Sequence, residues 1–198
     1  MLAPTMKRAL LLGFSMLFVV GCAPSPPANW ARGGSPLDIP HARWVRGDAS
    51  VEITGDGRIL VNGEHQLSID RGGRIVDLEA RPVALIERDG RLVGPDDKPL
   101  GVAGVWSASL PGETQAWLSL LPSGEVIRYG EDGARTSMGA WVGNCMASAP
   151  AHQTCMIVSH LLGMKLKDER PYNPGYPPGM TPGMGGLGGV GIGVGLFH

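Results

Sequence analysis

The middle of this 198-residue chain predicts a mainly β fold: an antiparallel meander of hairpins, barrel-like or two-layered, with one short C-terminal helix. Short runs rich in β-branched and apolar residues alternate there with turn dipeptides that contain glycine. The turn glycines are Gly57, Gly73, Gly90 and Gly124, at spacings of 16, 17 and 34 residues. A period near 17 suits one hairpin of two short strands and two turns, with one marker missing around Trp106.

Alternating polar and apolar residues within the hairpins predict one solvated face and one buried face for each of about eight to ten strands. So many antiparallel strands are expected to curl into a barrel or to fold into two layers. The residues predicted to point inward are Val51, Ile53, Leu67, Ile69, Ile75, Leu85, Trp106, Trp117, Leu120, Ile127 and Trp141.

The remaining segments differ in composition. Residues 22–46 contain five prolines and are predicted to form a tether to the hairpin domain, residues 47–144. Residues 145–170 combine a loop with one helix, interrupted or ended near Gly163, that we expect to cover an open end or edge of the sheet. Residues 171–198 contain ten glycines, five prolines and no Asp, Glu, Lys or Arg, and they are predicted to be a disordered low-complexity tail.

A secretory signal peptide is predicted over residues 1–21. Met6 precedes the basic pair Lys7 and Arg8, and an uncharged apolar run follows from Ala9 to Val20. A transmembrane helix needs about 20 such residues, whereas this run of 12 has the length of a signal-peptide core. A buried core helix is the alternative, but the basic flank and the Pro-rich segment after the run favour the signal peptide.

The stretch Val19-Val20-Gly21-Cys22 resembles the lipobox of bacterial lipoproteins. In that class the chain is cut before the cysteine, and the sulfur and amino group of the cysteine receive acyl chains such as palmitate. The resemblance covers only residues 1–22, and it implies that Cys22 is the mature N-terminus and the lipid attachment site. Ala23 follows the cysteine, and the absence of Asp at that place favours the outer membrane over the inner membrane. The implied location is the cell envelope, with the side of the membrane that the domain explores left open.

Size and charge restrict the possible functions. Removal of residues 1–21 leaves 177, enough for one domain with its own core plus tails. The net charge changes from −1 to −3 when Lys7 and Arg8 are lost (−1 − 2 = −3). The sequence has no long basic run, which argues against a nucleic-acid-binding protein.

Two cysteines remain beside Cys22, and in an oxidising compartment we expect Cys145 and Cys155 to form one disulfide. His152 and His160 lie in the same segment, so a zinc site is an alternative interpretation. The spacings of seven, three and five residues match no familiar zinc motif, and oxidation of the thiols would remove two ligands. A nucleophilic pair of Cys155 with His160 needs a free thiol and is disfavoured for the same reason.

Sequence motifs of hydrolytic, nucleotide-binding and haem-binding sites are missing, so no catalytic residue, cofactor or metal ligand is predicted. Asp96-Asp97 is interpreted as a turn rather than a calcium or paired-acid site. Glu64-His65 is interpreted as a solvated hairpin tip. Arg58, Arg74 and Arg91 follow turn glycines, where they either guard the turns or form a basic stripe that binds a polyanionic glycan.

The sequence therefore predicts a lipid-anchored envelope protein that is not an enzyme and that acts as a binding or assembly module. Its expected partners are the membrane, through the anchor, and an envelope protein or a polyanionic glycan, with no nucleic acid. Two alternatives stay open. One is an exported enzyme without a recognisable motif, and the other is a metal-binding envelope protein that uses the Cys145–His160 segment.

Overall fold

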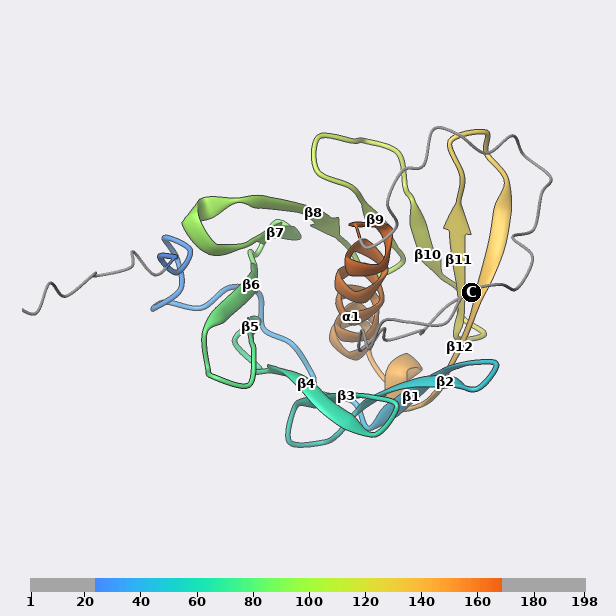
Figure 1. Cartoon of the computed structure of the whole chain (residues 1–198), viewed down its shortest axis with the longest axis horizontal. Coiled ribbons are helices and arrows are strands. Elements are labelled where there is room, and N and C mark those ends of the chain that lie inside the picture. Colours follow the sequence, from blue (N-terminus) through green and yellow to red (C-terminus); the bar gives the residue numbers. More distant parts are fainter. Residues whose placement is uncertain (1–23, 169–198) are drawn as a thin grey trace, which may run out of the picture.

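Twelve antiparallel strands and one long helix make up the computed structural model, which describes residues 24–168 (Figure 1). The strands follow one another around a ring, and β1 pairs with β12 to close it. The predicted mainly β meander is confirmed, and it takes the form of a closed barrel. The strands are β1 (Ala42–Arg46), β2 (Ala49–Ile53), β3 (Arg58–Val61), β4 (Glu64–Ile69), β5 (Arg74–Val76), β6 (Pro82–Ile86), β7 (Arg91–Val93), β8 (Pro99–Ala103), β9 (Ser107–Ser109), β10 (Leu118–Leu120), β11 (Glu125–Tyr129) and β12 (Arg135–Gly143).

The strand count exceeds the predicted range in part because β1 lies within residues 22–46, which were predicted to be a tether. The predictions for residues 1–23 and 169–198, which include the signal peptide, Cys22 and the C-terminal tail, lie outside the described residues.

The predicted turn glycines close a recurring type of hairpin turn. In the turn between β2 and β3, Gly57 N–H donates to Thr54 O (2.8 Å) and Thr54 N–H donates to Arg58 O (2.9 Å). The φ of Gly57 is +89°, and a Cβ on this residue would lie 2.1 Å from Ile69 O. Only glycine fits here, because the next strand approaches the turn closely and Ile69 N–H donates to Gly57 O. The same hydrogen bonds recur in the turns that contain Gly73, Gly90 and Gly124.

Most of the residues predicted to point inward are buried. Leu67 is partly buried and packs against the core, and the fully buried members of the predicted set are Val51, Ile53, Ile69, Ile75, Leu85, Trp117, Leu120 and Trp141. Leu85 is buried on the outer side of the barrel wall, between core residues Ala84 and Ile86, because it packs against Gly34.

Two further members of the predicted inward set are wrong, beside Leu85, which is buried but faces outward. Trp106 is 55% exposed because it lies in the tight connection between β8 and β9 rather than in a strand. Ile127 is only partly buried and its neighbour Val126 is in the core. A register shift between Glu125 and Ile127 in the pairing with β12 changes which residues face inward.

The helix α1 (Ala149–Asp168) lies inside the ring of strands (Figure 1). All seven residues from Thr154 to His160 are buried, so every face of two helical turns is covered. A barrel of about eight strands can be filled by its own side chains, and a ring of 12 is wider and needs further material inside. The predicted helix is confirmed, but its expected place at an end or edge of the sheet is wrong, and it continues past Gly163.

The described part of the predicted tether packs on the barrel. Asp96 Oδ1 accepts hydrogen bonds from the backbone N–H (2.9 Å) and hydroxyl (2.6 Å) of Ser25, and Ser35 N–H donates to Ile86 O (2.8 Å). Residues 42–46 form β1, which closes the barrel. The predicted boundary between tether and domain, after residue 46, is therefore too late in the chain. The prolines suggested a tether, but backbone hydrogen bonds hold part of this segment on the barrel.

The antiparallel order gives the barrel two distinct ends. The connections β1–β2, β3–β4, β5–β6, β7–β8, β9–β10 and β11–β12 lie at one end, and the other connections lie at the opposite end. The helix α1 enters at the second end, which we call the entry end, directly after β12. It runs toward the first, which we call the exit end, where its residue Gly163 packs against Trp117 at the start of β10.

Candidate functional site

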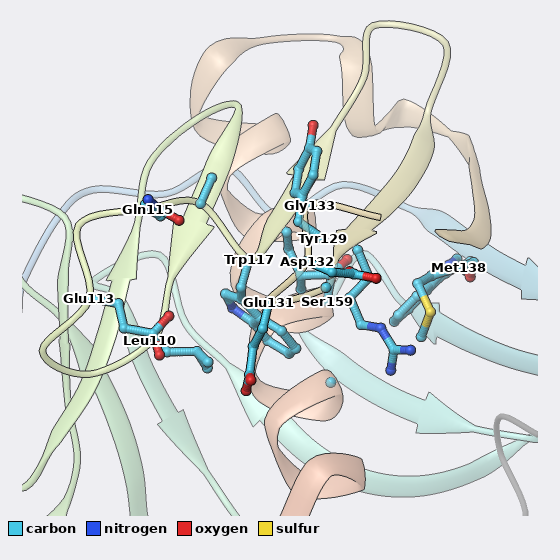
Figure 2. A pocket seen from close by; sticks show the side chains of 16 residues that line it. Leu110, Glu113, Gln115, Trp117, Tyr129, Glu131, Asp132, Gly133, Met138 and Ser159 are labelled. Carbon is cyan, nitrogen blue, oxygen red and sulfur yellow. Dashed lines mark hydrogen bonds between the residues drawn. The ribbon is translucent and has the colours of Figure 1, made fainter. Parts of the chain in front are cut away.

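A pocket of about 1000 Å³ opens at the exit end of the barrel (Figure 2). Its sides are the loop between β9 and β10, residues 110–117, and the turn between β11 and β12, residues 130–134. In Figure 2, Leu110 and Glu113 lie on one side, Met138 lies on the other, and Trp117 lies between them. The two sides belong to neighbouring hairpins, and the barrel topology brings them together with Trp44 of β1 and with Ser159 and Gly163 of α1.

The floor of the pocket is apolar and is built on the helix. Trp44, Trp117 and Met138 are buried side chains of the barrel wall that line it, and Ser159 and Gly163 contribute the surface of α1. A Cβ on Gly163 would lie 2.8 Å from Cη2 of Trp117, so the missing side chain makes room for the indole ring. The floor is therefore fixed by contact between the helix and the wall.

The mouth of the pocket is polar. Glu113, Glu131 and Asp132 are exposed, and Arg128 and Tyr129 are partly buried. These side chains come from loops and strand ends, whereas the floor comes from strand and helix residues. An apolar floor below a charged mouth is typical of a binding site for a ligand that has both kinds of surface.

Polar side chains of α1 hydrogen-bond to the barrel wall and fix the rotation and depth of the helix. Nδ1 of His160 accepts from Nε1–H of Trp117 (2.8 Å), and Nε2 of His160 donates to Leu100 O (2.7 Å). Ser159 Oγ accepts from Nε1–H of Trp141 (2.9 Å). Within residues 24–168, no buried side-chain nitrogen or oxygen lacks a hydrogen-bond partner.

Both histidines of the helix are structural. Burial lowers the pKa of His160 below its ordinary value, against a smaller opposing effect of the hydrogen bond to Leu100 O. Burial likewise lowers the pKa of His152, whose Nε2 donates to Leu120 O (3.2 Å) and whose ring contacts Trp106 edge-on at 4.3 Å between centroids. At both positions a neutral imidazole is buried and hydrogen-bonds to the barrel wall.

The predicted disulfide between Cys145 and Cys155 is present, with 6.0 Å between the two Cα atoms. It joins η2 (Asn144–Met146), the short helix after β12, to the first half of α1. The two sulfurs are bonded to each other and His152 and His160 bond to carbonyls, so the structure does not assemble the zinc alternative. In the described part of the chain, no cluster of three or more His, Cys, Asp or Glu side chains has the geometry to hold a metal.

The other polar sequence features are parts of turns. Asp96 and Asp97 lie in η1 (Pro95–Asp97), where both carboxylates bond to the N-terminal segment. This agrees with the predicted turn. Glu64 and His65 are the first two residues of β4, next to the hairpin tip. Glu64 is exposed, as the predicted solvated tip requires, whereas His65 is partly buried and its imidazole contacts Leu67 O at 2.9 Å.

The three arginines that follow turn glycines are at the entry end and are paired with acids of the same turns. The pairs are Arg58–Asp56 (2.9 Å), Arg74–Asp70 (3.0 Å) and Arg91–Asp89 (2.6 Å). Arg74 also donates to the carbonyls of Trp30 and Ala31, which fastens the N-terminal segment. Their charges are balanced within the turns, so a role in the turns accounts for these arginines without a polyanionic ligand.

The pocket was not predicted from the sequence. Of its lining residues, only Trp117 was in the predicted inward set, and the acids of the two loops gave no signal because their spacing matches no motif.

Within residues 24–168, no helix is both long enough and apolar enough to cross a membrane. Comparison with protein-family models, with curated proteins and with solved structures finds no match to this chain.

Proposed function

We propose that this protein is a lipid-anchored, non-catalytic binding or assembly module of a bacterial cell envelope, and that it binds its partner in the pocket at the exit end. The observation that carries the binding role is the contrast between a barrel interior filled by α1 and an open pocket above Trp117. Within the described residues, α1 packs against the core of the barrel. The pocket at the exit end is a concave surface that a partner can enter.

The disulfide supports export from the cytoplasm. Cys145 and Cys155 are fully buried and bonded to each other. Disulfides of this kind persist in oxidising compartments such as the periplasm and are rare in the cytosol. This agrees with the signal peptide over residues 1–21 and with an anchor on Cys22, more readily in the outer membrane than in the inner membrane.

The packed N-terminal segment would place the barrel close to the membrane. Ser25 is bonded to Asp96 at the exit end, and Cys22 is three residues earlier in the sequence. An extended chain covers at most about 10 Å over three residues. A lipid on Cys22 would thus hold the β7–β8 turn beside the bilayer surface, and the adjacent β9–β10 loop of the pocket would lie on the same membrane-facing end.

The anchor is tested by the intact mass of membrane-extracted protein, measured with and without reduction before thiol alkylation. We expect a chain that starts at Cys22 with added acyl mass, and two further alkylated thiols only after reduction. The Cys22→Ser variant is the control, and it should keep residues 1–21 and gain no acyl mass. An unprocessed wild-type chain would contradict the proposed lipid anchor and envelope location. Free thiols at Cys145 and Cys155 would remove the disulfide as support for export.

The charged mouth of the pocket favours one other candidate, an exported enzyme. Glu113, Glu131 and Asp132 are titratable side chains gathered at one site. All three are exposed, however, whereas catalytic acids work best where water is excluded. Turnover of an envelope substrate that is abolished in Glu131→Gln would favour the enzyme over the binding module.

A further inference from the structure

In four turns away from the pocket, acidic side chains pair with an arginine of the same turn, as in Asp56–Arg58, Asp70–Arg74, Asp77–Arg81 and Asp89–Arg91, whereas Asp48 and Glu64 are isolated acids of their turns. Among residues 24–168, Glu113, Glu131 and Asp132 make no ion pair. Their charges are left for a group that comes from outside.

The charge of the pocket selects a cation. Three carboxylates, on Glu113, Glu131 and Asp132, and one guanidinium, on Arg128, give the lining a formal charge of −2 (1 − 3 = −2). The guanidinium of Arg135 lies 5.8 Å from the ring centroid of Tyr129, beside the mouth, and with it the local charge is −1 (−2 + 1 = −1). Glu113 belongs to the loop on one side, and Glu131 and Asp132 belong to the turn on the other side (Figure 2). A cation between the two segments meets carboxylates from both sides, whereas an anion is repelled.

The floor requires that the cation carry apolar surface. Trp117 is 7% exposed and lies below the mouth beside Met138 and Leu110. Lysine and arginine side chains have apolar stems that pack on such surfaces while the charged head reaches polar groups. Indole faces also attract cations directly. A small inorganic cation would leave this floor uncovered.

The width of the pocket suits a chain segment. A volume of about 1000 Å³ is at the upper limit for small-molecule sites, and the mouth is open between two loops. We propose that the pocket binds a cationic peptide segment, which places an apolar side chain over Trp117 and Lys or Arg side chains between Glu113 and the Glu131–Asp132 pair. This inference deepens the proposed binding role and rests on it.

The test measures binding of a labelled short peptide of alternating Leu and Lys to the full chain in zwitterionic nanodiscs, by fluorescence anisotropy with empty nanodiscs as the blank. We expect saturable binding that weakens with added salt, because screening acts on exposed charges. The same peptide with Glu in place of Lys should not bind. The chain has five tryptophans, so a change of tryptophan emission on titration with unlabelled peptide would report contact with the Trp117 floor only if the Trp117→Phe variant lacks it.

Matched variants assign the binding to the pocket. The double variant Glu131→Gln with Asp132→Asn should weaken binding of the Leu-Lys peptide about tenfold, which corresponds to about 1.4 kcal/mol. The control pair, Glu64→Gln with Asp48→Asn, removes two exposed acids of other turns at the same end and should leave the affinity unchanged. Circular dichroism of both variants checks the fold.

Three results would overturn the proposal: no saturable binding of the Leu-Lys peptide, equal binding of the Leu-Glu peptide, or an equal loss of affinity in the control pair. Equal binding of both peptides would point to a purely apolar occupant. The peptide titration and the mass measurement are independent. A chain that lacks acyl mass but binds the cationic peptide contradicts the lipid anchor alone, and a lipidated chain that ignores the peptide contradicts this inference alone.

Discussion

Nε1–H of Trp117 donates a 2.8 Å hydrogen bond to Nδ1 of His160, inside the barrel. The bond joins the floor of the pocket to the helix. It also fixes the imidazole tautomer, because Nδ1 accepts and Nε2 must therefore carry the proton that it donates to Leu100 O. Protonation of Nδ1 would place two N–H donors against each other and break the bond.

Acid should destabilise the fold through this contact. Burial lowers the pKa of His160 in the folded state, so below about pH 6.5 the unfolded chain binds more protons than the folded chain. The free energy of unfolding is expected to be highest above that pH and to fall as the pH drops toward the lowered pKa. Urea titrations at a series of pH values across this window measure the change.

A histidine variant separates this effect from the titration of carboxylates. His160→Gln should show a smaller loss of stability between neutral and acidic pH than the wild type, although it starts from lower stability. The carboxylates are unchanged in His160→Gln, so their contribution should be the same in both pH profiles. Identical pH profiles for His160→Gln and wild type would contradict the assignment to His160.

Trp117→Phe should lower the free energy of unfolding by about 1–3 kcal/mol. The substitution removes the indole N–H and leaves Nδ1 of His160 buried without a donor. Trp106→Phe is the matched control, since Trp106 is exposed, and it should cost no more than about 0.5 kcal/mol. Chemical denaturation followed by circular dichroism compares them, and similar costs for the two variants would count against the hydrogen bond.

Gly163→Ala should destabilise the protein despite the higher helix propensity of alanine, which alone would contribute about 1 kcal/mol. The added Cβ would lie 2.8 Å from Cη2 of Trp117 and would displace the indole. In the Trp117→Phe background the clash disappears, because phenylalanine has no Cη2. There the same substitution should be neutral or stabilising. A double-mutant cycle measures this coupling, and additive effects would show that the two side chains do not meet.

Gly57→Ala should be far more costly than Gly63→Ala. Both glycines have positive φ, +89° and +85°, so alanine at either position pays a backbone cost of about 1–2 kcal/mol. Only at Gly57 would the Cβ also meet a backbone atom, Ile69 O at 2.1 Å, whereas the space around Gly63 is open. Thermal melts of the two variants give the comparison. Equal shifts would mean that the strand retreats from the turn at little cost.

The sequence predicted those parts of the fold that local chemistry determines. Turn glycines such as Gly57 marked the hairpins because the positive φ requires them, and the pairing of Cys145 with Cys155 followed from their number and the expected compartment. Trp106 and Ile127 were misplaced because a tight connection and a bulge interrupt the alternation of strand residues. A single residue of offset exchanges the two faces of a strand.

Long-range packing determined what the sequence did not predict. The place of α1 inside the barrel depends on the width of a 12-strand ring, which no local pattern encodes. Its signal was present in residues 154–160, which carry no formal charge and, apart from His160, have small or apolar side chains on all sides. The candidate site was predicted least, because Glu113 and Glu131 come together only when β9–β12 are in place.

The position of α1 at the end of the described chain has a consequence for how the protein is made. In the described chain, the helix that fills the ring follows all twelve strands, and ring closure pairs Ala42 with Gly143, which are 101 residues apart (143 − 42 = 101). The first hairpins therefore lack the helix against which their apolar faces pack until α1 has been made. Such non-local closure makes folding slow. We expect residues 24–168 to fold only after all of them have been made, and an unfolded polypeptide is the form that can be threaded through a narrow translocation channel.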